Sequence, residues 1–101
     1  MTTAEGAGDA LFADPLPAGF TRRVLRVAPG HELGVEPARL SEALVVVEQG
    51  AVELVCRAGT CRRFGRGSML PIVLPPVSHL RSVGPGPLVL VAVSRAAASQ
   101  R

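Results

Sequence analysis

The sequence predicts a small all-β domain, and three observations lead to this class. Short segments rich in Val and Leu recur along the chain, Gly and Pro separate them, and none keeps a helical apolar period over eleven or more positions. Even spacing of such segments is typical of a sandwich or barrel. The expected strands are residues 20–28, 42–48, 51–57, 60–64, 68–74, 78–83 and 88–94.

The chain of 101 residues is long enough for one domain, which we place at residues 20–95. Residues 1–19 are small and polar with two prolines, and residues 96–101 form a second short tail. We expect the first segment to be a flexible tail, since its composition offers little to offset the entropy lost on ordering. The alternative is an arm that lays Leu11 and Phe12 across a partner subunit.

The composition argues against several classes of function. Three Phe, no Trp and no Tyr leave few rings for stacking nucleic-acid bases, and a net charge of +3 is small. We therefore expect no nucleic-acid partner. The sequence shows no secretory signal pattern, and no apolar run approaches the roughly 18 residues that would cross a bilayer. The expectation is a cytoplasmic protein without a membrane partner.

Two of the expected strands are apolar on both faces, at residues 43–47 and 88–93. A small β domain would leave the outer face of each strand in water. Continuous Val and Leu there indicate that another surface covers them. The simplest cover is a second copy of the chain, so we expect a homodimer.

The stretch from Glu42 to Arg95 resembles the cupin family in the order of its turns and strands. The matching pieces are Val46-Val47-Glu48-Gln49-Gly50, residues 51–55, Ala58-Gly59, Gly65-Arg66-Gly67-Ser68 and Pro75-Pro76-Val77-Ser78-His79. The resemblance implies a jelly-roll barrel of about 7–8 antiparallel strands.

The metal motif of that family is incomplete here. Metal cupins carry two alternate His followed by a Glu before the first turn, and a further His later in the chain. Residues 36–41 contain no His; Glu42 lies near the family's Glu, and His79 lies near the later His. Two ligands are too few for a stable transition-metal site, so we expect no metal and no cofactor.

Residues 64–68, FGRGS, are also similar to a turn of cyclic-nucleotide-binding domains, which use a related barrel. That family holds the phosphate on a short helix with a Gly-Glu pair. Here residues 69–74 read as a β segment containing Pro71, so the resemblance does not bring a nucleotide site with it.

His79, Arg81 and Glu42 are the candidate ligand-binding residues. His79 and Arg81 are two positions apart in one strand and share a face, which we expect to line the barrel interior. The alternative is a His that is simply hydrogen-bonded in the barrel wall.

Cys56 and Cys61 flank the turn at Ala58-Gly59, which would set them directly opposite each other as a redox pair. In a reducing cytoplasm they would instead be two small apolar residues.

These features lead to a non-metal binding or regulatory domain that holds a small apolar or anionic ligand in its barrel. The first alternative is a metal-independent isomerase or cyclase using His79 and Glu42 as acid and base. The second is a structural accessory subunit that works through its apolar faces. The sequence leaves catalysis undecided and identifies no catalytic residue.

Overall fold

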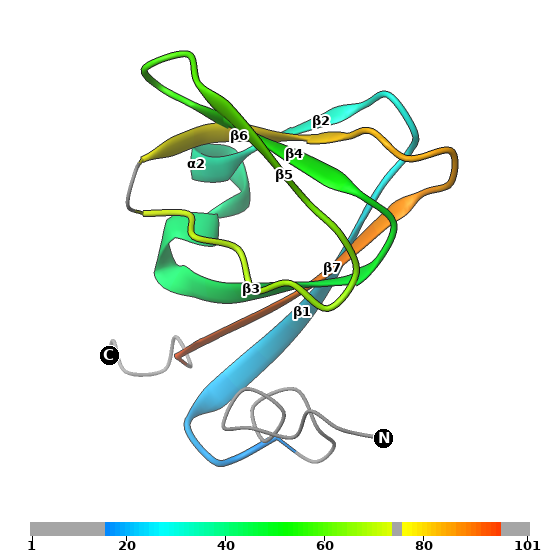
Figure 1. Cartoon of the computed structure of the whole chain (residues 1–101). Coiled ribbons are helices and arrows are strands. Elements are labelled where there is room, and N and C mark those ends of the chain that lie inside the picture. Colours follow the sequence, from blue (N-terminus) through cyan, green and yellow to red (C-terminus); the bar gives the residue numbers. More distant parts are fainter. Residues whose placement is uncertain (1–15, 74–75, 96–101) are drawn as a thin grey trace.

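The computed structural model describes residues 16–73 and 76–95, which form antiparallel strands in two sheets (Figure 1). The elements are β1 (Phe20–Val27), β2 (Glu32–Gly34), α2 (Val35–Ala38), η1 (Leu40–Glu42), β3 (Ala43–Gln49), β4 (Val52–Cys56), β5 (Cys61–Phe64), β6 (Val77–Ser82) and β7 (Leu88–Arg95). The predicted all-β class is confirmed. Most of the predicted N-terminal tail, with Leu11 and Phe12, and the C-terminal tail lie outside the described residues.

Strands that are far apart in the sequence pair in a nested order. Sheet A has the order β1-β7-β3, and sheet B has the order β2-β6-β4-β5. Beyond β3, Met69 forms an isolated antiparallel bridge with Val46. The chain is thus doubled back on itself: β1 pairs with β7, β2 with β6, β3 with the segment at Met69, and β4 with β5. Over the described residues the two sheets stay separate and do not join into one closed ring.

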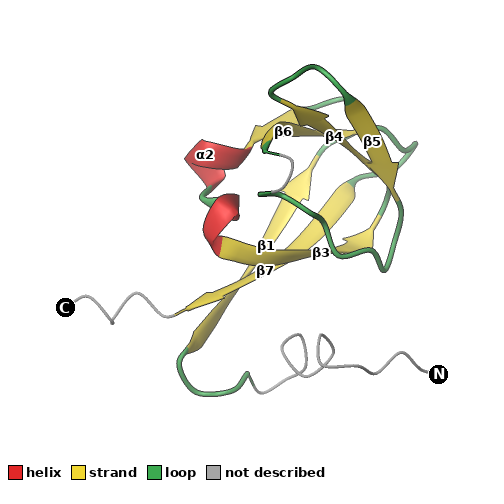
Figure 2. Ribbon diagram, turned by 60° about the vertical axis from the view of Figure 1, so that its left-hand side comes forward, coloured by secondary structure: helices red, strands yellow, loops and turns green. Residues whose placement is uncertain are grey.

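The space between the sheets is filled by aliphatic side chains. Alternate residues of each strand point inward, as a half-buried sheet requires. At one end α2 and η1 lie between the sheets and add Val35 and Leu40 to the core (Figure 2). The fully buried aliphatic residues of the core are Leu40, Val45, Val47, Val52, Leu54, Leu80, Leu88 and Leu90.

Gly50 makes the sharp turn that carries the chain from sheet A to sheet B. Its φ of +92° lies in the left-handed region, which favours glycine. A Cβ at this position would lie 2.6 Å from the carbonyl oxygen of Pro87. Both the backbone conformation and the close packing therefore require a glycine in the Gln49-Gly50 turn, which the sequence predicted.

The structure differs from the sequence expectation in two places. The three-residue strand β2 was not expected, because Glu32-Leu33-Gly34 is too short to show a β pattern. Residues 68–73 contribute only the bridge at Met69, because Pro71 has no N–H to continue a ladder. Residue 74, the last of that expected strand, lies outside the described part.

Candidate functional surfaces of the two sheets

His79 and Arg81 lie on the outer face of sheet B. Their neighbours in β6, Leu80 and Ser82, are buried and point into the core, whereas the side chains of His79 and Arg81 are 26% and 41% exposed. The prediction that His79 and Arg81 share a face is confirmed. The prediction that this face lines the interior is wrong, because the apolar residues of β6 take the inward positions.

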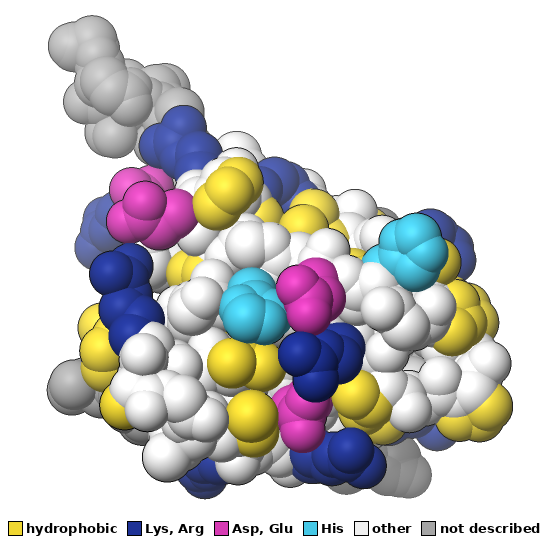
Figure 3. Space-filling model, turned by 90° about the horizontal axis from the view of Figure 1, so that it is seen from above, with side chains coloured by type: hydrophobic (Ala, Val, Ile, Leu, Met, Phe, Trp, Pro, Cys, Tyr) yellow, Lys and Arg dark blue, Asp and Glu magenta, His cyan; other side chains and the backbone are white. Residues whose placement is uncertain are grey.

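Arg81 is the centre of a row of alternating charges that crosses all four strands of sheet B. In the strand register Glu32 lies opposite Arg81, Arg81 opposite Glu53, and Glu53 opposite Arg63. The guanidinium of Arg81 donates to Glu32 Oε2 at 3.2 Å and to Glu53 Oε1 at 2.9 Å. Arg63 Nε is 3.5 Å from Glu53 Oε2, so each charge has an opposite neighbour. Figure 3 looks onto this face and shows acidic and basic side chains alternating beside a histidine.

His79 extends this row toward the next level of the sheet. Its Nε2 lies 3.6 Å from Glu32 Oε2, and its Nδ1 shares a 3.0 Å hydrogen bond with Ser78 Oγ. The residues opposite His79 on the flanking strands are Gly34 and Val55, which have no ionisable side chains. His79 is therefore held by its carboxylate and hydroxyl neighbours on an open surface.

Glu42, the third candidate residue, is not placed with His79 and Arg81. It ends η1, and its Oε1 accepts a 3.2 Å hydrogen bond from Arg39. The carboxylate that contacts both His79 and Arg81 is Glu32. Sequence spacing did not identify Glu32, since only the pairing of β2 with β6 brings it to this row.

Cys56 and Cys61 do not face each other, so the predicted cross-strand pair is wrong by one residue of register. Cys61 lies opposite Val55 and is exposed, whereas Cys56 is buried in the core. The cause is Gly59, which has a φ of +98° and lengthens the turn, so that Cys56 N–H bonds to Thr60 O. The two thiols are free and point to opposite faces of the sheet.

The outer face of sheet A has a different character. The outward residues of its central strand β7 are Val89, Val91 and Val93, and the inward residues Leu88, Leu90 and Ala92 belong to the core. The register defines three rows across β1, β7 and β3. They are Arg26-Val89-Gln49, Val24-Val91-Val46 and Arg22-Val93-Leu44. Met69 extends the middle row through its bridge to Val46. The predicted double-sided apolar strands are thus neighbours, and their outward side chains form one surface.

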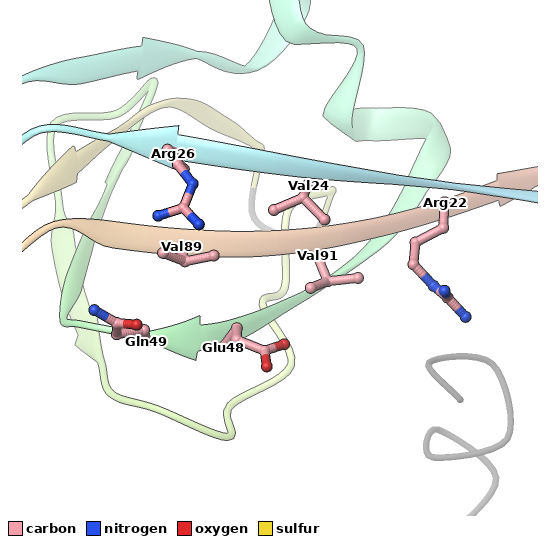
Figure 4. Close-up of a pocket in the computed structure, with 7 residues that line it drawn as sticks. All are labelled: Arg22, Val24, Arg26, Glu48, Gln49, Val89 and Val91. Carbon is pink, nitrogen blue, oxygen red and sulfur yellow. The ribbon is translucent and has the colours of Figure 1, made fainter. Parts of the chain in front are cut away.

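A shallow hollow of about 460 Å³ lies on this face over β7 (Figure 4). Its floor is Val89 and Val91. The β1 side carries Arg22, Val24 and Arg26, and the β3 side carries Glu48 and Gln49. The hollow is open, with an apolar floor and charged groups along its sides.

The described residues contain no group of three or more His, Cys, Asp or Glu side chains that could hold a metal ion. The same part of the chain contains no helix long and apolar enough to span a membrane.

The fold and its surfaces define a small all-β domain of two antiparallel sheets, with one largely apolar outer face and one charged outer face. No family model, no curated protein and no solved structure matches this chain.

Proposed function

We propose that this chain is a non-catalytic assembly domain that forms a homodimer through the outer face of sheet A. The observation that carries the proposal is the row of Val24, Val91, Val46 and Met69, which crosses that face and stays apolar from edge to edge. A monomer would leave Val24 and Met69, at the two ends of this row, exposed to water.

The exposure of the outer face supports an interface. Val24, Leu44 and Met69 are large apolar residues with between two fifths and three fifths of their surface exposed. They surround β7, whose outward valines are already buried by their neighbours. A second apolar surface placed here would remove the exposed side chains from water. The gross gain is about 25 cal/mol for each Å² of apolar area, and the loss of translational and rotational freedom on association opposes it.

We further propose that the two sheets form a jelly roll related to that of the cupins. The nested pairing of the strands supports this relationship, because a jelly roll arises when a long doubled chain rolls into two facing sheets. In that comparison the segment at Met69 stands for an eighth strand at the edge of sheet A.

The two ligand-based alternatives receive less support from the geometry. A ligand inside the fold would compete for space with the Val and Leu side chains between the sheets. Acid–base chemistry by His79 and Glu42 would need the two side chains together, but they contact Glu32 and Arg39, respectively. Assembly through a surface requires neither arrangement.

The experiment compares two valines of nearly equal exposure. Val24 on the outer face of sheet A is 56% exposed, and Val73, beside the start of β6, is 58% exposed. In light scattering at tens of micromolar, we expect the parent chain and V73D to show twice the 10.5 kDa chain mass, and V24D to show the chain mass. An Asp at Val24 would place a carboxylate within the apolar row of the interface, which opposes its burial in the dimer.

Circular dichroism of V24D should match that of the parent chain, since the site is exposed in one copy. A parent chain that is monomeric at this concentration would contradict the proposal. So would a V24D variant that dimerises as strongly as V73D.

A further inference from the structure

The outer face of sheet A carries opposite charges on its two sides. Arg26 is an outward residue of β1, and Glu48 belongs to the end of β3. Both are exposed and both line the hollow over β7 (Figure 4). In the described part of the chain neither is in an ion pair. The valines of β7 separate them, so this face has a basic side, an apolar centre and an acidic side.

Arg26 and Glu48 also lie at the same level along the strands. Arg26 is opposite Val89, and Val89 is opposite Gln49. Glu48 is the extra residue at the irregularity between Val47 and Gln49, so it lies next to this row. The other end of the face, where Val93 is central, has no acidic residue in its row.

Two copies of this face can pack with aligned strands in two symmetric ways. If the two-fold axis is parallel to β7, each row of residues across one sheet faces the same row of the other copy. The order of the strands within the row is then reversed. β1 of each copy then faces β3 of the other. If the axis is perpendicular to the strands, β1 faces β1 and the levels are reversed. Arg26 would then face the row of Arg22, Val93 and Leu44 in the other copy, which has no acidic residue to pair with it.

We propose that a second copy packs on sheet A with the two-fold axis parallel to β7, so that Arg26 of each copy pairs with Glu48 of the other. This arrangement rests on the homodimer proposed above and specifies its geometry. It places Val24 of one copy toward Val46 of the other and stacks the β7 valines at the centre. The apolar rows supply the contact area, and the two symmetric ion pairs select the orientation.

A charge-exchange experiment tests this orientation. We expect R26E and E48R each to raise the dimer dissociation constant about tenfold or more, because each substitution sets like charges together twice across the two-fold axis. The double variant R26E/E48R restores opposite charges and should return to within about threefold of the parent value. The measurement is sedimentation equilibrium at low and high salt, and the losses in the single variants should shrink at high salt.

The matched control exchanges charges elsewhere on the chain. Arg57 and Glu36 form an exposed pair at 3.8 Å, away from sheet A, and R57E, E36R and the double variant make the same changes in net charge. All three should dimerise as the parent does.

The parent could be dimeric while the effects of R26E and E48R on its dissociation constant simply add in the double variant. That result would overturn the orientation and leave the homodimer in place. An R26E dimer tighter than the parent would also overturn it, because that result fits arginines facing each other. A parent that is monomeric would overturn the homodimer itself.

Discussion

The outer faces of the two sheets share one geometric plan and differ in chemistry. On each face one four-residue row crosses the strands at a single level. The rows are Val24-Val91-Val46-Met69 over sheet A and Glu32-Arg81-Glu53-Arg63 over sheet B. The first row is apolar throughout, and the second alternates in charge.

This difference separates a surface whose charges are paired within one copy from a surface that leaves large apolar side chains exposed. On sheet B every charge of the row has an opposite neighbour in the same chain, so the monomer satisfies it in water. On sheet A the outward valines of β7 are buried by their neighbours, but Val24, Leu44 and Met69 around them stay largely exposed. The homodimer proposed above would cover these side chains. The strands on which the sequence predicted that interface, residues 43–47 and 88–93, lie in sheet A, whereas the candidate ligand-binding residues His79 and Arg81 lie in sheet B.

The largest effect should come from the core that both sheets share. Leu80 is fully buried and lies between His79 and Arg81 in β6. We expect Leu80→Ala to lower the free energy of unfolding by about 2–5 kcal/mol, because it removes buried methyl groups and leaves a cavity. Leu90→Ala, at the same depth in sheet A, should have a similar effect. Urea denaturation at one fixed protein concentration measures both.

His79→Ala is the comparison on the opposite face of the same strand. It removes a ring that is 26% exposed and has one hydrogen bond and a contact with Glu32, and the expected loss is within about 1 kcal/mol. If Leu80→Ala cost no more than His79→Ala, the inward and outward assignment of β6 would be wrong.

The next effect concerns the charged row. Arg81→Met removes the guanidinium that joins Glu32 to Glu53. The side chain of Glu53 is only 13% exposed. We expect a loss of about 1–2 kcal/mol in the free energy of unfolding, since Glu53 keeps only the 3.5 Å contact with Arg63. The loss should be smaller at high salt, because salt screens the exposed charges of the row.

Arg57→Met is the matched change for a pair that is exposed on both sides. Its cost should stay within about 0.5 kcal/mol. Equal costs for Arg81→Met and Arg57→Met would mean that the row over sheet B behaves as isolated surface charges.

Local patterns in the sequence predicted most of the fold. The strands ending at Gln49 and beginning at Leu88 were predicted within a residue or two, because β-branched runs and a required glycine are local signals. β2 was missed because three residues carry no period. Its formation depends on pairing with β6, which is more than 40 residues away.

The site was less predictable, because it depends on which face of a strand points inward. Alternation correctly placed His79 and Arg81 together, but it does not say which face meets the core. Leu80 decided this by burial. The carboxylate beside His79 is Glu32 and not Glu42, because β2 pairs with β6. The spacing of residues along the sequence does not predict the register between distant strands.

The smallest effect tests the register of the β4–β5 turn through its two thiols. Cys61 is exposed on the outer side of sheet B, so Cys61→Ser should change the free energy of unfolding by less than about 0.5 kcal/mol. Cys56→Ser puts a hydroxyl into the core and should cost about 1–2 kcal/mol. In the folded parent a thiol reagent should label Cys61 rapidly and Cys56 only after unfolding. Rapid formation of a Cys56–Cys61 disulfide in the folded chain would contradict the register, because it would require the thiols to share a face.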